Sequence, residues 1–441
     1  MNIQEIKKLS LYNRTLLQKL NEWLDSDETL IITGSRQVGK TSLLFLLIQE
    51  LLKKKVSDRH IYYFDLEDFD ILDLCNQGTK NFVHHMKTLG EDFKSRVYVF
   101  FDEIQYLENP SNFLKLLHDH YKKIKTVCSG SSTLDIRRKF KDSLVGRKIV
   151  FELYPLTFKE FLLFKKKNDL LNFLAQYSIK NIVKEQQPDA PSSIVLTELE
   201  ILLNEYIRFG GYPAVAKIDG DDKKRVLLNE IYQTYVRRDI NQLFSIEKVS
   251  AFNRLVGLLG FQIGQLVNLQ ELSINISSAR QTLQNYLFIL ENTFILKLLY
   301  PFYTNKRKEL VKMPKVYFLD SGLRNQIVKN TTALNQRPDA GALIENFAFQ
   351  QIVANLRIDE DLKFWRTQSR NEVDFVIESN ELIPIEIKYK PFQKPQIPTG
   401  IRFFIQNYNC KNAFVVTKNY FGKTQKNGCD IYFLPVMLFG G

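Results

Sequence analysis

A glycine-containing run near the N-terminus has the GxxxxGK[ST] spacing of a phosphate-binding loop. Its residues are Gly34, Ser35, Arg36, Gln37, Val38, Gly39, Lys40 and Thr41, and Ser42 follows. The glycines let backbone N–H groups surround phosphates, and a helix beginning near Lys40 would direct its positive dipole end at them. Lys40 would neutralise the β- and γ-phosphates, and Thr41 would offer its hydroxyl to Mg²⁺. The run therefore predicts a site for ATP and Mg²⁺.

Two adjacent acids, Asp102 and Glu103, follow the apolar run 97–101. A central strand that ends in this way delivers carboxylates to the edge of the sheet where α/β proteins bind ligands. We expect Asp102 to hold Mg²⁺ through water, and Glu103 to polarise the attacking water as a general base. A later strand ends in Ser129-Gly130-Ser131-Ser132, where Ser131 is preferred over Ser132 for sensing the γ-phosphate or orienting the water. Hydrolysis is therefore predicted together with binding.

Phosphoryl transfer commonly also uses an arginine, from the same chain or from a neighbouring copy. The candidates are Arg137, Arg138, Arg147, Arg237 and Arg238. Arg147 is preferred because it directly precedes the fifth expected strand. A solvated surface charge is the alternative for each of them.

The elements that must position these residues alternate between strand and helix over residues 30–155. Apolar runs at 30–34, 61–68, 97–103, 126–132 and 149–154 predict strands, and helical patterns cover 41–55, 79–91 and 112–124. Apolar runs separated by amphipathic helices indicate buried parallel strands in a doubly wound α/β sheet. Residues 156–245 are mostly helical in pattern, with a loop at 186–193 and a break at the GGYP run, 210–213.

Residues 250–325 have the pattern of a helix–turn–helix followed by a hairpin with a basic tip, as in a winged helix. The second helix places Leu283, Tyr286, Leu287 and Leu290 on the stripe that should face the core. The side chains placed to meet DNA are Arg280, Gln281, Gln284 and Asn285 on that helix, and Lys306, Arg307 and Lys308 at the tip. Their types favour contacts to the DNA backbone over base readout. The alternative is a protein–protein contact or a lid in an oligomer.

The C-terminal part contains a second set of acids. Strands at 372–377 and 382–390 are joined by a short turn, and alternation puts Glu386 and Lys388 on one face with Asp374 toward the same side. Two carboxylates beside a lysine suit Mg²⁺ coordination, with Lys388 steadying the attacking water or the scissile phosphate. Glu345, on the preceding helix, could complete the cluster. A half-buried hairpin also alternates apolar and charged residues, so the EIK run alone indicates little.

These residues resemble the AAA-like ATPases that carry a C-terminal domain of unknown function with a PD-(D/E)XK nuclease-like ending. The matching runs are GSRQVGKT, FFDEIQ, SGSS, LYPLTFKEFL, GGYPAVA, YVRRDI, FLDSGL, GALIENF, EVDFVI and IPIEIK. The resemblance implies an α/β P-loop NTPase core (AAA-like, ASCE) at 1–155, a helical lid at 156–245, a winged helix at 246–325 and a nuclease-like α/β domain at 326–441. Whether the nuclease-like site cleaves DNA stays open, since such folds also persist as binding modules.

Length and composition fit this division. A chain of 441 residues predicts two to four domains. The net charge of +12, concentrated in the last third, favours a polyanionic partner such as DNA. No apolar run is long enough for a membrane span, the first twenty residues do not have the pattern of a secretory signal, and the four cysteines are scattered. We therefore expect a cytoplasmic protein with no membrane contact.

The sequence thus predicts an ATPase that couples nucleotide turnover to remodelling or translocation on duplex or branched DNA, as a homo-oligomer with ATP near subunit interfaces. One alternative is a regulatory switch, controlled by ATP occupancy, in defence or transcription control. Another is a metal-dependent nuclease gated by ATP. A non-enzymatic protein-binding scaffold is the third.

Overall fold

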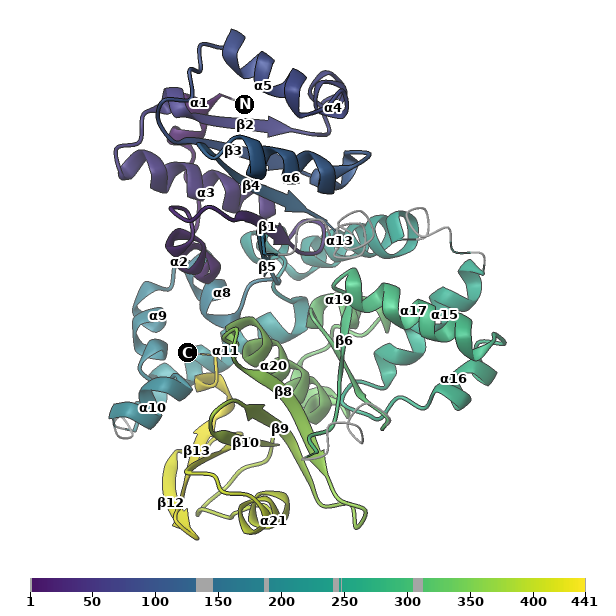
Figure 1. Cartoon of the computed structure of the whole chain (residues 1–441). Coiled ribbons are helices and arrows are strands. Elements are labelled where there is room, and N and C mark those ends of the chain that lie inside the picture. Colours follow the sequence, from purple (N-terminus) through teal and green to yellow (C-terminus); the bar gives the residue numbers. More distant parts are fainter. Residues whose placement is uncertain are drawn as a thin grey trace. The chain divides into compact units, whose positions relative to one another are not determined.

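The computed structural model describes residues 2–131, 146–185, 190–240, 246, 248–303 and 312–440. The chain divides into two compact units (Figure 1). The first comprises Met1–Tyr154 and Asn292–Phe294, and the second comprises Pro155–Glu291 and Ile295–Gly441. The finer division into four domains stays a prediction. Every helix in the described ranges is too short or too polar to cross a membrane.

The first unit is built on a five-stranded parallel sheet. Its strands are β1 (Thr29–Thr33), β2 (Ile61–Asp65), β3 (Val97–Asp102), β4 (Ile124–Gly130) and β5 (Lys148–Glu152), in the order β2-β3-β4-β1-β5. All residues of β1, β3 and β4 are buried, which explains the apolar runs of β1 and β3. The five expected strands are confirmed, and their carboxyl ends lie at one edge of the sheet because all pairings are parallel.

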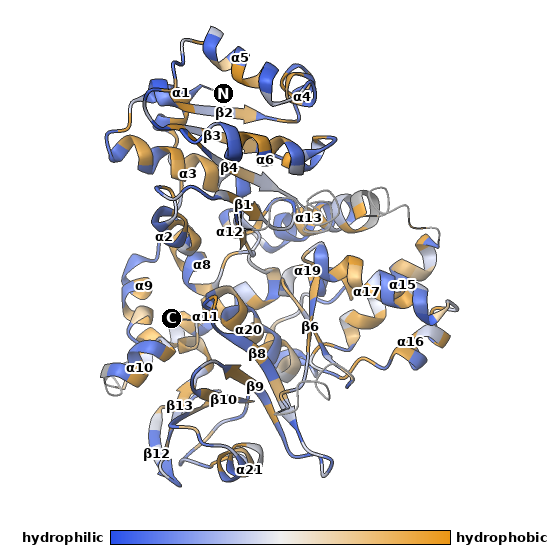
Figure 2. Cartoon of the chain, viewed as in Figure 1, coloured by the Kyte–Doolittle hydropathy of each residue, from blue (hydrophilic) through white to orange (hydrophobic). Residues whose placement is uncertain are grey.

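Helices cover both faces of this sheet. They are α1 (Ile3–Lys8), α2 (Thr15–Glu22), α3 (Lys40–Lys53), α4 (Phe69–Asn76), α5 (Thr79–Thr88) and α6 (Pro110–His120). Val97, Val99 and Phe101 of β3 belong to the core formed with α4, α5 and α6, whereas Tyr98 and Phe100 point away from it and are also buried. Helix α6 accordingly carries both orange and blue residues in Figure 2. This is the doubly wound arrangement predicted.

The second unit begins with helices. They are α8 (Phe158–Phe164), α9 (Asn168–Ala175), α10 (Ile179–Glu185), α11 (Ser193–Phe209), α12 (Pro213–Lys217) and α13 (Asp221–Ile231), followed by a π-helical segment, η4 (Tyr232–Asp239). Next come α15 (Val249–Phe261), α16 (Leu269–Asn275), α17 (Arg280–Asn292) and the antiparallel strands β6 (Leu296–Leu299) and β7 (Lys315–Phe318). The mostly helical pattern of 156–245 is thus confirmed for its described residues.

Helix α17 separates apolar and polar residues as expected. The four residues assigned to the core, Leu283, Tyr286, Leu287 and Leu290, are buried. The four polar residues, Arg280, Gln281, Gln284 and Asn285, are exposed. Lys306, Arg307 and Lys308 lie outside the described residues. The interpretation of this region as a winged helix stays a prediction.

Two of the runs that carry the family resemblance, GGYP and FLDSGL, meet in the second unit. The carboxylate of Asp320 caps α19 (Ser321–Ile327) by accepting from the N–H of Leu323 at 2.7 Å, and it also accepts from the N–H of Gly211 at 2.7 Å. Gly210 has a φ of 78°, and a β-carbon there would lie 2.2 Å from Oδ1 of Asp320. The two runs therefore pack closely against each other, and only glycine fits at position 210.

The C-terminal part of the second unit is a six-stranded mixed sheet. Its elements are α20 (Ala340–Asn355), β8 (Asp361–Arg366), β9 (Glu372–Glu378), β10 (Leu382–Lys388), α21 (Thr399–Asn407), β11 (Asn412–Thr417), β12 (Gly422–Lys426) and β13 (Cys429–Pro435). The strand order is β12-β13-β11-β10-β9-β8, with β11 parallel to both β10 and β13 and the other pairs antiparallel. The expected hairpin is confirmed as β9 and β10 (Figure 1).

Candidate nucleotide site and C-terminal acid cluster

The phosphate-binding loop joins the end of β1 to the start of α3. Gly39, the N-cap residue of α3, has a left-handed backbone with a φ of 96°, which glycine adopts without steric cost. A β-carbon on Gly34 would lie 2.4 Å from the carbonyl oxygen of Leu153, so the loop passes too close to its neighbour for a larger residue. The hydroxyl of Ser35 is buried and has no hydrogen-bond partner among the described residues. An unsatisfied hydroxyl in a glycine-shaped loop fits a polar ligand such as a phosphate.

The side chain of Lys40 lies inside this loop. Its Nζ donates to the carbonyl oxygens of Gly34 at 3.2 Å and Ser35 at 3.0 Å, and lies 4.0 Å from Oε1 of Glu103. Burial lowers the pKa of Lys40, against the opposing effect of the negative charges on Glu103 and Asp102. An anionic ligand beside Nζ would favour the charged ammonium.

Asp102 is the last residue of β3 and is held from both neighbouring strands. The hydroxyl of Tyr63 in β2 donates to Oδ2 of Asp102 at 3.0 Å, and the hydroxyl of Ser129 in β4 contacts Oδ1. Glu103 follows with a left-handed backbone, at φ 55° and ψ 51°. Such a conformation is uncommon for a residue with a side chain and is found preferentially at functional sites.

Gln105 connects Glu103 to the end of β4. Its Nε2 contacts Oε2 of Glu103 and donates to the hydroxyl of Ser131 at 3.1 Å. The backbone N–H of Ser131 in turn donates to Oε1 of Gln105 at 3.2 Å. The residue types had not suggested a role for Gln105, although it lies within the FFDEIQ run. Ser131 is thus linked to Glu103 through Gln105, and its role in sensing the γ-phosphate or orienting the water stays a prediction.

Arg147 is placed at the wrong edge of the sheet to act on the nucleotide of its own chain. Its backbone carbonyl accepts from Thr29, the first residue of β1, whereas the phosphate-binding loop follows the last residue of β1. Its guanidinium Nε donates to Oδ1 of Asp119 at 2.8 Å. Arg147 is therefore not placed to act within its own chain, and its contribution from another copy stays a prediction. Ser132, Arg137 and Arg138, together with the side chains of Arg237 and Arg238, fall outside the described part.

A buried arginine that the sequence did not single out lies beside the loop. Arg14 donates from Nη1 to the carbonyl oxygen of Val38 and from Nη2 to that of Tyr154, both at 2.7 Å. It therefore ties the phosphate-binding loop to the last residue before the second unit begins at Pro155.

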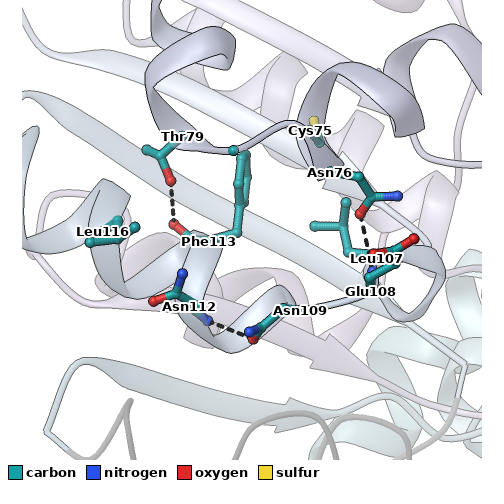
Figure 3. Close-up of a pocket in the computed structure, with 10 residues that line it drawn as sticks. Cys75, Asn76, Thr79, Leu107, Glu108, Asn109, Asn112, Phe113 and Leu116 are labelled. Carbon is teal, nitrogen blue, oxygen red and sulfur yellow. Dashed lines mark hydrogen bonds between the residues drawn. The ribbon is translucent and has the colours of Figure 1, made fainter.

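A surface pocket of the first unit lies between the α4–α5 turn and the start of α6 (Figure 3). Three of its polar side chains bond within the pocket: Asn76 accepts from the N–H of Glu108, Asn109 accepts from that of Asn112, and Thr79 donates to the carbonyl of Phe113. None of the residues predicted for the nucleotide lines it. The pocket is therefore separate from the candidate site.

The predicted C-terminal residues come together in the second unit. Asp374 and Glu386 are buried, and Oδ2 of Asp374 accepts from the N–H of Ile387 at 2.7 Å. Lys388 Nζ lies 2.5 Å from Oε1 of Glu386. Burial, reinforced by the charge of Asp374, raises the pKa of Glu345 to about 7 and that of Glu386 to about 8. These shifts show that the carboxylates are crowded in a poorly hydrated space.

A second lysine, absent from the prediction, lies among these acids. Lys315 of β7 is 3 % exposed, and its Nζ lies 2.6 Å from Glu372, 3.2 Å from Glu345 and 3.8 Å from Asp374. Burial alone would lower the pKa of Lys315, but the charges of Glu345, Asp374 and Glu372 outweigh it and raise the pKa. The ammonium is therefore charged. Lys315 precedes Asp374 by more than fifty positions and looks in the sequence like an ordinary charge at the start of a strand.

The acid cluster does not fit a divalent metal in this arrangement. Within the described ranges, no three histidine, cysteine or acidic side chains converge as a set of metal ligands. The predicted trio of Asp374, Glu386 and Glu345 is assembled, but an ammonium lies among the acids.

Comparisons with known proteins bear on both regions. Residues 26–162 match the family model "AAA domain", residues 200–334 match "Domain of unknown function (DUF8612)", and residues 340–438 match "Domain of unknown function (DUF4143)". The first match contains the whole nucleotide site, and the third contains all the predicted C-terminal acids.

Similar proteins occur in distant organisms. An uncharacterized protein of Methanocaldococcus jannaschii is 28 % identical over 392 residues, covering 87 % of this chain and 79 % of its own length. One from Haemophilus influenzae is 23 % identical over 440 residues, covering 97 % and 98 %. Among solved structures, PCH-2 of C. elegans is similar at 16 % identity and a TM-score of 0.31, over 53 % of this chain and 66 % of that one. The chain therefore contains an AAA domain of the P-loop type, followed by a C-terminal region that matches the model of the DUF4143 domain of unknown function.

Proposed function

We propose that the chain hydrolyses ATP at the phosphate-binding loop and uses this turnover to remodel or translocate on duplex or branched DNA. The observation that carries the hydrolysis is the position of Glu103. Its carboxylate lies 4.0 Å from Lys40, contacts Gln105, and is linked through Gln105 to Ser131. A base held between a phosphate-binding lysine and a polar residue at the next strand end is positioned for an attacking water.

Each residue of the site has a distinct role in this proposal. Thr41 and Asp102 would hold Mg²⁺, which when bound neutralises charge on the phosphates. Lys40 binds the β- and γ-phosphates, and Glu103 accepts the proton of the attacking water. Gln105 holds the carboxylate of Glu103, and Ser131 lies where it can orient the water. Tyr63 and Ser129 fix Asp102.

The DNA part of the proposal is supported by charge and by exposed polar side chains. The net charge of +12 favours a polyanion. Arg280, Gln281, Gln284 and Asn285 form an exposed face of α17 that can meet phosphates and base edges. We also propose that the protein forms a homo-oligomer, because an arginine for phosphoryl transfer is often supplied by a neighbouring copy. Its proposed location is the cytoplasm.

The test is steady-state ATP hydrolysis with Mg²⁺, measured without DNA, with linear duplex and with a four-way junction. Glu103→Gln serves as the control. Stimulation by DNA that is lost in the variant supports the proposal, and the ranking of the two substrates indicates the preferred DNA structure. Slow hydrolysis that is equal under the three conditions would instead favour a regulatory switch. Hydrolysis that is unchanged by Glu103→Gln would overturn the assignment of the base.

A further inference from the structure

The acid cluster of the second unit contains more carboxylates than a nuclease-type site requires, and a lysine lies among them. The acids are Glu345 from α20, Glu372 and Asp374 from β9, and Glu386 from β10. Lys315 reaches the first three with Nζ–oxygen distances of 2.6 to 3.8 Å. These are the lengths of ammonium–carboxylate contacts, whereas Mg²⁺ binds oxygen at about 2.0–2.1 Å.

The strand that carries Lys315 is held in place by contacts with α20. The N–H of Phe318 donates to Oδ1 of Asn346 at 2.8 Å, and its carbonyl accepts from Asn346 and Gln350, both at 3.0 Å. Both partners belong to α20 and are buried. Tyr317 stacks on Phe349 with ring centroids 4.5 Å apart. The backbone of β7, which carries Lys315, is therefore held against α20.

One acid of the cluster keeps an unused oxygen. Glu386 is 4 % exposed, and its Oε1 pairs with Lys388. Its Oε2 is buried and has no hydrogen-bond partner within the part of the chain that the structure describes. A buried carboxylate oxygen without a partner is costly, and it is normally explained by a ligand or by strain. The cluster therefore still has one carboxylate oxygen, Oε2 of Glu386, that neither Lys315 nor Lys388 contacts.

We propose that Lys315 is the resident cation of this cluster and that a divalent metal ion binds there only when the Lys315 ammonium is removed. With the ammonium in place, a divalent ion would have to approach a buried positive charge and compete with it for Glu345, Glu372 and Asp374. Without the ammonium, Glu345, Glu372 and Asp374 lose the cation that all three now contact, and carboxylate oxygens are the ligands that Mg²⁺ and Mn²⁺ prefer. The proposal does not depend on ATP hydrolysis in the first unit.

The test is Mn²⁺ binding to the full chain by titration calorimetry, without nucleotide. Lys315→Met removes the charge and keeps a side chain of similar length, and Lys315→Arg keeps the charge. We expect Lys315→Met to gain a site at least about tenfold tighter than any binding by the natural chain. Asp374→Asn should abolish the gain when combined with Lys315→Met, and Lys315→Arg should bind like the natural chain.

Thermal unfolding supplies a second readout. Lys315→Met leaves Glu345, Glu372 and Asp374 without the ammonium that they contact, so it should unfold at a lower temperature, and Mn²⁺ should restore that temperature only in this variant. Lys315→Gln, which is smaller and polar, takes its place if the methionine variant does not fold. No gain of Mn²⁺ binding in a folded uncharged variant would overturn the proposal. So would an equal gain in Lys315→Arg, or a loss of Mn²⁺ binding when Asp374→Asn is introduced into the natural chain.

Discussion

The carboxylate of Glu103 lies 4.0 Å from the ammonium of Lys40. The proposed base therefore adjoins the residue that would hold the phosphates, although one directly follows β3 and the other is the first residue of α3. Mutations of these two residues should have different effects: one on catalysis and the other on ATP binding.

Glu103→Gln should retain ATP binding and lower kcat by about 100-fold or more, because an amide cannot accept the proton of the water. Lys40→Ala should instead weaken ATP binding by more than about tenfold, because the phosphates lose their neutralising charge. Phosphate release and fluorescent-nucleotide binding measure the two effects. Lys53→Ala on the same helix, at an exposed position, is the control and should change neither.

Gln105→Leu should lower kcat by about tenfold with little change in KM, because the carboxylate of Glu103 loses the contact that positions it. Gln77→Leu removes an exposed glutamine of the same unit and should have no effect. Equal losses in the two variants, or a change confined to KM, would show that Gln105 does not position the base. The measurement is steady-state hydrolysis over a range of ATP concentrations.

The stability of the second unit should depend on pH through Asp320. Burial raises the pKa of Asp320 to about 6, against the lowering effect of its hydrogen bonds to the N–H groups of Leu323 and Gly211. The folded state then binds more protons than the unfolded state between about pH 4 and 6, so stability falls as pH rises through this window, by on the order of 3 kcal/mol.

Asp320→Asn should flatten this dependence, because the amide does not titrate. Urea unfolding at intervals between pH 4 and 7 measures the slope. The comparison uses the slope and not the absolute stability, since the amide also changes the capping of α19. A slope that is unchanged in the variant would show that another group titrates in this window.

Gly210→Ala should destabilise the second unit by more than about 2 kcal/mol, because the left-handed backbone and the carboxylate of Asp320 leave no room for a methyl group. Gly257→Ala is the matched control. Its added methyl group meets nothing within 4 Å, and it lies inside α15, so it should stabilise by about 0.5–1 kcal/mol. Thermal unfolding separates the two.

Arg280→Ala should weaken DNA binding and lower the slope of log affinity against log salt concentration by about one, if this side chain contacts a phosphate. Arg59→Ala, an exposed arginine of the first unit, should leave the slope unchanged. Fluorescence anisotropy at several salt concentrations provides the slope. Identical slopes for Arg280→Ala and the natural chain would remove α17 from the proposed DNA surface.

The parts that the sequence predicted are those in which local pattern and chemistry agree. Buried parallel strands are continuous apolar runs, so β1 and β3 were evident, and the acids after β3 followed from strand direction. Alternation along β9 and β10 likewise brought Asp374 and Glu386 to one side. The stripe of Leu283 and Leu287 in α17 was equally clear.

The parts that the sequence did not predict depend on strand direction or on distant contacts. Arg147 precedes a parallel strand, and residues before such strands lie at the edge opposite to those that follow them. Lys315 reaches Glu372 and Asp374 through the packing of β7 on α20, which no local pattern encodes. Helix α4 is short and mixes aspartates with apolar residues, so its pattern was too weak to predict.

Arg14 links two backbone segments of the first unit that are far apart in the sequence. One guanidinium holds the backbone of Val38 in the phosphate-binding loop and the backbone of Tyr154, which immediately precedes the second unit. Any shift of the loop on exchange of ATP for ADP would thus pull on the chain at the point where it leaves the nucleotide domain. A single buried side chain thus joins the phosphate-binding loop to the last residue of the first unit's N-terminal segment.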